Sequence, residues 1–322
     1  MPDLVMHHYF GRKVLEGLDK DLISKIELDT YDFATAGPDP FFFISFLNRK
    51  ENPKHLEFGG FMHRNNTKEF LLELIEETKN NPLLKSYLYG FVTHYFLDTF
   101  THPYVFHFTG NYEKENEDTL VYRGLHTKLE RAMDTYIIKK YYYSKPHKFK
   151  IYKNILKLKK LNQNIENEIN KVYKKVYGIE DGFDLVNKSI KDQKKFYRFI
   201  YDPFGLKNKL FALLDNGKSS IDFKVLSYYG KEILDIDIFN FKNQKWTNPV
   251  DDRLTFNDSF FDLFDEAKTK AIETIKNIEK YLNDEKVILD DYIKNTSYIT
   301  GLDCCDTRPM RFFNNIFGSS KA

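Results

Sequence analysis

Histidine, the side chain that most often binds metals in proteins, is confined to the first half of this chain. The chain has 322 residues and nine histidines, and none of them lies after residue 147. Random placement would rarely leave the second half without any histidine, so this distribution predicts a functional site in the first half. The histidines are at positions 7, 8, 55, 63, 94, 102, 107, 126 and 147.

Two of these histidines have a carboxylate four residues further along: His94 precedes Asp98, and His126 precedes Glu130. On a helix this spacing places both side chains on the same face, one turn apart. The zinc-binding helices of metalloproteases hold their metal with the same spacing. A single pair of this kind is more often a hydrogen bond in a protein core, but two pairs together indicate a metal centre.

Adding His63 and His102 gives six nitrogen and oxygen ligands, which is three for each of two metal ions. Three protein ligands per ion is typical of catalytic zinc sites, which leave a position for water. A closed structural zinc site would use cysteines, and this set has none. His107 remains an alternative to His102, while His8, His55 and His147 are interpreted as ordinary surface or core residues.

The elements that carry these residues are predicted to be helices. Asn81 and Pro82 are typical of a helix start, and the helix is expected to run to about Thr101, where His102-Pro103 ends it. A second helix, over about 119–143, carries the His126 pair. His7 lies near the start of the first helix, and Asp39 lies in a Gly-Pro-Asp-Pro turn that the two prolines make rigid.

The second half is also predicted to be helical, with helices over 151–176, 184–200 and 257–282 and another one beginning at Pro203. No run of alternating residues indicates a sheet, and 301–322 is expected to be irregular. We therefore predict an all-α protein, a single domain over 1–322 with a metal-site half over about 1–147 and a Lys-rich half over about 148–300. Residues 139–175 contain twelve lysines and two acids, which favours a solvated face and leaves an anionic membrane or nucleic acid as the alternative.

The composition narrows the class of protein further. The chain is 42% hydrophobic and carries a formal net charge of +2, which excludes a disordered chain and gives no overall basic field for nucleic-acid binding. Its two cysteines, Cys304 and Cys305, are adjacent and do not form a disulfide framework. With no leader-like N-terminus and no apolar stretch long enough to span a bilayer, we expect a cytoplasmic protein without a transmembrane segment.

The order of these residues resembles the zinc-dependent phospholipase C family. The segments Met-Pro-Asp-Leu-Val-Met-His, Gly-Pro-Asp-Pro-Phe, Gly-Phe-Val-Thr-His-Tyr-Phe-Leu-Asp and His-Thr-Lys-Leu-Glu are similar to an intracellular bacterial branch of that family. The resemblance implies an all-helical fold around up to three zinc ions, which single-strand-specific zinc nucleases share. The similarity to the family is close within residues 1–134 and weaker beyond them.

Carried over by position, the resemblance implies a role for each residue of the set. Two zinc ions are expected, with a third as an alternative. Their ligands would be His63, His94 and Asp98 for the first ion, His102, His126 and Glu130 for the second, and His7 with Asp98 for the third. Asp39 would orient or deprotonate the attacking water. Zinc ions lower the pKa of such a water and hold phosphodiester oxygens.

We therefore predict a zinc-dependent phosphodiester hydrolase that resembles phospholipase C, with a phospholipid as one candidate substrate and a peripheral membrane contact as one candidate interaction. The first alternative is a nuclease-like phosphodiesterase with the same metals, acting on nucleic acid. The second is a non-catalytic helical binding protein that keeps metal for stability.

Overall fold

The computed structural model describes residues 4–46, 53–215, 223, 226–228 and 236–318. Within them helices are the main regular structure and the sheet has only two short strands, as predicted for an all-α protein. The α-helices are α1 (Leu4–Leu15), α2 (Lys20–Ser24), α3 (Leu28–Ala34), α4 (Pro53–Met62), α5 (Thr67–Asn80), α6 (Lys85–Thr109), α7 (Leu125–Lys140), α8 (Ile151–Asn154), α9 (Glu166–Tyr177), α10 (Gly182–Ile200), α11 (Leu206–Leu214) and α12 (Phe260–Leu282).

Short 3₁₀ helices and one small hairpin connect them. The 3₁₀ helices are η1 (Asp39–Phe43), η2 (Pro82–Leu84), η3 (Glu117–Tyr122), η4 (Pro146–Lys148), η5 (Gln163–Ile165) and η7 (Leu289–Asp291). The hairpin pairs β1 (Trp246–Thr247) with β2 (Thr255–Phe256) in antiparallel fashion. The sequence pattern did not predict it, because two residues per strand are too few to show an alternation.

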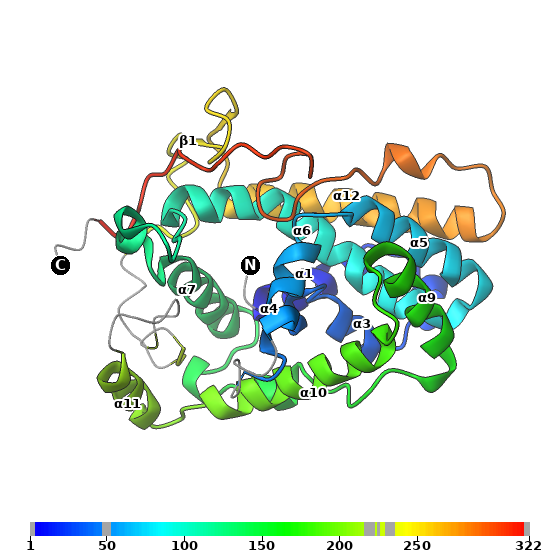
Figure 1. The fold of residues 1–322 in the computed structure, drawn as a ribbon, viewed down its shortest axis with the longest axis horizontal. Helices are drawn as coiled ribbons and strands as arrows, with labels where there is room; N and C mark the ends of the chain where they lie inside the picture. Colours follow the sequence, from blue (N-terminus) through cyan, green and yellow to red (C-terminus); the bar gives the residue numbers. More distant parts are fainter. Residues whose placement is uncertain (1–3, 47–52, 216–222, 224–225, 229–235, 319–322) are drawn as a thin grey trace.

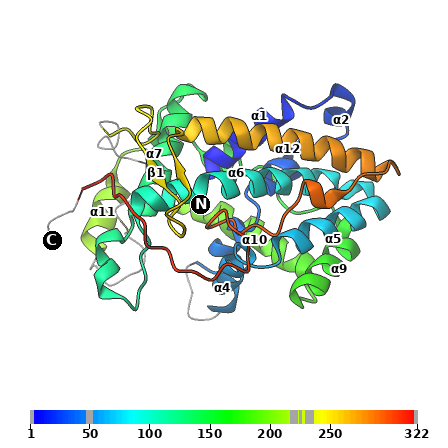
Figure 2. The same ribbon diagram turned by 90° about the horizontal axis from the view of Figure 1, so that it is seen from above.

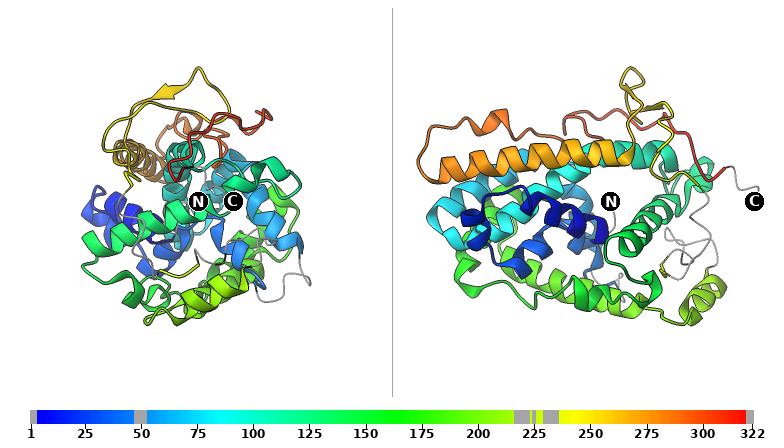
Figure 3. Two further views of the ribbon diagram at one scale, coloured as in Figure 1. Left: turned by 90° about the vertical axis from the view of Figure 1, so that its left-hand side faces the viewer. Right: turned by 180° about the vertical axis from the view of Figure 1, so that it is seen from behind.

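The central element is α6, a 25-residue helix buried on all sides along most of its length. It contacts α1, α3, α5, α7 and α12. Figure 1 shows α6 and α12 side by side along one edge of the molecule and α10 along the opposite edge, with α1, α3 and α4 between them. The right-hand view of Figure 3 shows the same order from behind, and Figure 2 shows α12 beside α6 from above. Because side chains on all faces of α6 are buried, other elements can pack around the whole helix.

The prediction that His102-Pro103 ends this helix is wrong, because α6 continues to Thr109. A proline inside a helix costs roughly 3 kcal/mol, since it removes one hydrogen bond and crowds the preceding turn. The residues beyond it repay that cost by burial: Tyr104 and Val105 are both 0% exposed. Tertiary packing therefore overrides the local preference, and the extra turns keep His102 inside a regular helix.

The C-terminal tail packs against the end of α6. The backbone N–H groups of Asn314 and Ile316 donate to the carbonyls of His107 and Phe108. These are carbonyls of the last turn, which have no partner within the helix itself. The described part of the tail, 301–318, contains no helix and no regular strand, as predicted. It nevertheless supplies hydrogen-bond donors to the end of α6.

The predicted helices of the second half are only partly right. The helix expected over 151–176 is divided into α8, η5 and α9. The break is stabilised by side chains: the Leu161 N–H donates to Asn187 Oδ1, and the Asn164 N–H donates to Asn162 Oδ1. The helix over 184–200 is confirmed as α10. The helix expected at Pro203 begins instead at Leu206, after Gly205 in a left-handed conformation.

Two further predicted boundaries move inward. The helix expected over 119–143 consists of η3 followed by α7. The helix expected over 257–282 begins at Phe260, because Ser259 and Asp262 form a reciprocal capping box there. In the described part of the chain, no helix combines the length and the apolar character needed to cross a membrane.

Candidate metal centre

Two groups of metal-ligand side chains come together in the interior of the described structure. The first consists of Asp39, His63, His94 and Asp98, and the second of His102, His126 and Glu130. Within each group, one ligand atom from every residue lies within 4.8 Å of the others. These candidate ligands come from η1, the turn that follows α4, α6 and α7.

The first group is fully enclosed. His94 Nε2 lies 3.0 Å from Asp98 Oδ2, and His63 Nε2 lies 3.0 Å from Asp39 Oδ1. His63 Nε2 is also 3.8 Å from Asp98 Oδ2. Asp39 is 5% exposed and the other three residues are 0% exposed. Asp39 therefore lies within the ligand group, where its carboxylate can bind a metal as well as orient water.

The second group adjoins the first. His126 Nε2 lies 2.8 Å from Glu130 Oε1, and His102 Nε2 lies 3.8 Å from the same oxygen. His102 Nδ1 is in turn 3.4 Å from Asp98 Oδ2, a carboxylate oxygen of the first group. The two groups are thus neighbours along one edge of α6.

Helix α6 brings the two groups together because its ligands recur every four residues. His94, Asp98 and His102 lie on one face of the helix, each about one turn from the next. Gly37, in the Gly-Pro-Asp-Pro turn, lies against this face with a φ of +50°. A Cβ at that position would be 2.3 Å from His94 Cδ2. The glycine therefore allows the turn that carries Asp39 to approach the helix closely.

His7 lies beside the first group without belonging to it. Its ring stacks on His94 with centroids 4.6 Å apart, and its Nε2 is 3.2 Å from Asp98 Oδ1. The carboxylate of Asp134 accepts hydrogen bonds from the backbone N–H groups of Val5 and Met6 at 3.2 and 2.8 Å. This contact attaches the first turn of α1 to α7 and thereby places His7.

Tyr298, which sequence reasoning missed, supports both groups. Its carbonyl accepts a hydrogen bond from His102 Nδ1 at 2.5 Å, and its N–H donates to the His63 carbonyl at 2.8 Å. Its ring packs edge-on against His63 and His94. Backbone contacts of this kind leave no trace in the residue type, so no sequence signal could have identified them.

Hydrogen bonds from Nδ1 orient two of the imidazoles. His63 Nδ1 donates to the Gly59 carbonyl at 2.6 Å, as His102 Nδ1 does to Tyr298. A donating Nδ1 leaves Nε2 as the lone-pair nitrogen in the neutral ring. This nitrogen lies 3.0 Å from Asp39 in His63 and 3.8 Å from Glu130 in His102. Both rings are therefore held in the tautomer that a metal requires.

The electrostatics of the site favour the ligand forms of these groups. Burial lowers the pKa of His94, of His126 and of His102, the last to about 4. Burial alone would raise the pKa values of Asp98 and Glu130, but the imidazoles beside them hold both pKa values well below the ordinary range. Neutral imidazoles and ionised carboxylates are the forms that bind divalent metals.

The arrangement fits zinc. Among the described residues, both ring nitrogens of His7 and of His94, both carboxylate oxygens of Asp98, and Nε2 of His102 have no hydrogen-bond partner although all are buried. Buried polar atoms are normally paired, because leaving them unpaired costs free energy. Among them, His7 Nε2 and His94 Nε2 lie 3.2 and 3.0 Å from the Asp98 carboxylate. Nitrogen and oxygen without sulfur is the donor set of catalytic zinc sites.

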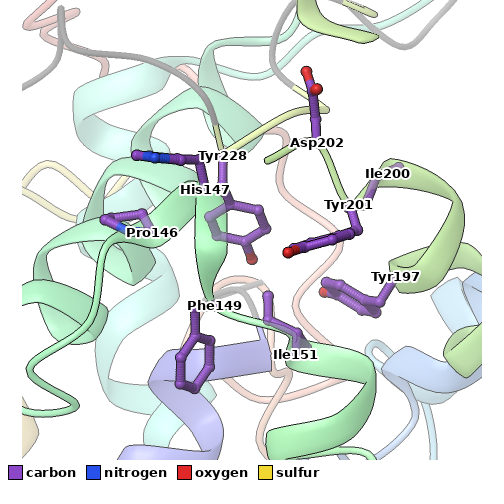
Figure 4. A pocket seen from close by; sticks show the side chains of 9 residues that line it. All are labelled: Pro146, His147, Phe149, Ile151, Tyr197, Ile200, Tyr201, Asp202 and Tyr228. Carbon is purple, nitrogen blue, oxygen red and sulfur yellow. The ribbon is translucent and has the colours of Figure 1, made fainter. Parts of the chain in front are cut away.

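The other described histidines lie elsewhere. His107 Nδ1 donates to the Phe312 carbonyl at 3.0 Å, and His8 contacts Tyr142 and Asp32. His147 borders a cavity of about 10 Å³, enough for about one water. Figure 4 shows its lining, which includes none of the clustered ligands. The side chain of His55 lies outside the described residues.

His102 and His107 lie five residues apart on α6 and are both buried, so each is a control for the other. We expect His102→Ala to lose about one zinc ion per molecule, because His102 is one of three ligands in its group. We expect His107→Ala to retain its zinc. Elemental analysis of both purified variants measures this, and equal zinc content in the two would contradict the assignment of His102.

Gly301 offers a test of the segment that carries Tyr298. It has a φ of +66°, and a Cβ there would lie 2.7 Å from the Thr99 carbonyl oxygen and 2.9 Å from Pro103 Cγ. We expect Gly301→Ala to push this segment away from α6 and to weaken zinc binding about tenfold, as loss of a supporting contact does. Gly178→Ala is the matched control, since Gly178 also has a positive φ but nothing within 4 Å. A competition titration with a chromogenic chelator measures the affinities, and equal values would contradict a supporting role.

Comparison with known proteins agrees with this geometry. None of the curated proteins and none of the solved structures that were compared matches the chain. A family model described as zinc-dependent phospholipase C matches residues 6–212, which include every clustered ligand and His7. The resemblance seen in the sequence is thereby confirmed: the chain belongs to the zinc-dependent phospholipase C family.

Proposed function

We propose that this protein is a zinc-dependent phosphodiester hydrolase that cleaves phospholipids. The observation that carries the proposal is the pair of adjacent buried ligand groups, which Asp98 and His102 connect at 3.4 Å. Neighbouring metal sites of this kind are suited to holding both the attacking and the leaving oxygen of a phosphodiester. The second group offers three ligands, which leaves a position for water, whereas a closed structural zinc site has four.

Each ligand group would hold one zinc ion. Asp39, His63, His94 and Asp98 would hold the first ion, and His102, His126 and Glu130 would hold the second. His7 with Asp98 would hold a third. Zinc, when bound, would act as a Lewis acid on the phosphodiester and lower the pKa of a bound water.

The protein's own side chains would position the reactants. Asp39 is 5% exposed whereas the other members of the first group are 0% exposed, and its carboxylate can accept a proton from the attacking water. Tyr298 and Gly59 would keep the imidazoles of His102 and His63 in orientation through their carbonyls. The family membership supports a phospholipid as the substrate.

Three substrates assayed side by side with zinc-loaded protein test the proposal: phosphatidylcholine vesicles, a soluble chromogenic phosphodiester and single-stranded DNA. We expect hydrolysis of the first two and release of phosphocholine from the lipid. Cleavage of DNA alone would assign a nuclease-like function instead. Cleavage of none of the three would favour a non-catalytic protein that keeps metal for stability.

A further inference from the structure

Helix α11 turns an apolar stripe outward. Four leucines of this nine-residue helix lie at spacings that form one stripe on an ideal helix of about 100° per residue. They are Leu206, Leu210, Leu213 and Leu214, with exposed fractions of 68, 51, 85 and 59%. In a globular protein such a stripe normally faces the core, whereas here only Phe211 of the helix is buried.

Both ends of α11 are held in place, so the stripe belongs to a formed helix. Asp202 Oδ2 accepts a hydrogen bond from the Asn208 N–H in the first turn at 2.8 Å. After the last turn, Asp215 Oδ1 forms an ion pair with Arg123 Nη2 at 2.7 Å, and both side chains are largely buried. The leucines are thus presented to solvent by a fixed scaffold.

The charges around the stripe have one sign. Lys207 and Lys209 are the only charged residues of α11, and residues 203–214 contain no acid. On a helical wheel the two lysines fall on opposite sides of the leucine stripe. Lysines that flank an apolar face can lie at the level of anionic lipid headgroups while the leucines enter the acyl region.

An ion pair connects this helix to the segment that leads into α7. Arg123, its ion-pair partner, precedes α7 and is three residues before the ligand His126. Figures 1 and 2 both show α11 at one end of the long axis of the molecule, beyond α7, whereas the C-terminal end of α12, which leads to η7, lies towards the opposite end. A membrane surface that bound α11 would therefore lie at the end of the molecule where α7 is found.

We propose that α11 is an interfacial helix that inserts its leucine stripe into a phospholipid bilayer containing anionic lipid. The one-sided charge favours a lipid surface over a second copy of the chain, because two such faces would bring four lysines together. The proposal of membrane binding depends only on the observations made on α11. Its benefit to catalysis, which is to bring the metal centre to lipid substrate, rests on the proposed function.

A vesicle co-sedimentation experiment with zinc-loaded protein tests this proposal. Vesicles are made of phosphatidylcholine alone or of phosphatidylcholine with phosphatidylglycerol. We expect the protein to bind the mixed vesicles more tightly, and Leu213→Glu to reduce that partitioning about tenfold or more, because one leucine leaves the acyl region and a like charge approaches the anionic surface. Lys209→Gln should reduce only the preference for phosphatidylglycerol.

Ile288→Glu is the matched control, since Ile288 is 64% exposed and precedes η7 at the far end. It should bind vesicles as the parent protein does. Hydrolysis of the soluble chromogenic phosphodiester is measured in parallel and should be equal in the parent and in Leu213→Glu. Binding of vesicles without hydrolysis of any substrate would refute the proposed function but would still support the proposal that α11 binds membranes.

Three outcomes would overturn the membrane proposal. The first is that the parent protein remains in the supernatant with both kinds of vesicle. The second is that the parent protein is a dimer in solution that Leu213→Glu dissociates, which would assign the stripe to a second copy. The third is that Leu213→Glu loses vesicle binding and soluble hydrolysis together, which would make α11 a structural part of the metal centre.

Discussion

Replacement of Asp39 by asparagine is expected to slow phosphodiester hydrolysis about a hundredfold to ten-thousandfold, the usual cost of losing a general base. The carboxylate lies 3.0 Å from His63 Nε2 and belongs to the first ligand group. An amide of the same shape cannot accept the proton of the attacking water and is a weaker metal ligand. We therefore also expect a lower zinc occupancy, measured by elemental analysis beside the rate.

Asp32→Asn is the matched control for this variant. Asp32 is 1% exposed and pairs with Arg12 and His8, but it belongs to neither ligand group. Its replacement should lower the melting temperature while leaving the zinc content and the rate per folded molecule unchanged. If Asp39→Asn behaved in the same way, Asp39 would be a structural residue and its assignment to the reaction would be wrong.

The rate and the zinc content of Asp39→Asn together separate its two roles. A slow variant with full zinc would make Asp39 the residue that orients or deprotonates water. A slow variant with about one zinc ion less would make it chiefly a ligand. Zinc titration of the variant distinguishes weakened binding from a lost site.

Removal of zinc is expected to lower the melting temperature by about 10 °C or more. A metal that binds only the native state at a thousand times its dissociation constant adds about 4 kcal/mol per site. At an unfolding entropy of roughly 2.1 cal/mol/K per residue, each kcal/mol changes the melting temperature of this 322-residue protein by about 1.5 °C, so two such sites together give about 10 °C or more. Without metal, the carboxylates of Asp39 and Asp98 and the imidazoles around them stay buried within 4.8 Å of one another, which is costly.

Differential scanning calorimetry before and after chelation measures this effect, with elemental analysis to verify that the metal has left. Re-addition of zinc should restore the melting temperature, whereas magnesium should not, because imidazole is a poor ligand for magnesium. His94→Ala should respond less to chelation than the parent protein. An unchanged melting curve after verified removal would contradict a metal centre that connects the core helices.

The sequence by itself determined the local geometry of the site. The pairs His94/Asp98 and His126/Glu130 meet because a helix places residues i and i+4 on one face whatever surrounds it. The all-α class followed for the same reason, since the apolar spacing of long helices is a local property. The order of the ligands along the chain was also sufficient to identify the family, which the family model confirmed.

Only the tertiary structure decided how the segments meet. The prediction that α6 ends at Pro103 failed because the cost of proline is local, whereas the burial of Tyr104 and Val105 depends on segments far away in the chain. His102 and His107 are the same residue type on one helix, and only packing against α7 distinguishes them.

The support from Tyr298 and the outward stripe of α11 were likewise invisible in the sequence. A backbone carbonyl carries no residue signature, so the contact between Tyr298 and His102 could only be found in space. An amphipathic pattern predicts that a helix has an apolar face but not what covers it. Periodicity therefore gave the faces of the helices, while long-range packing decided which faces meet and which remain exposed.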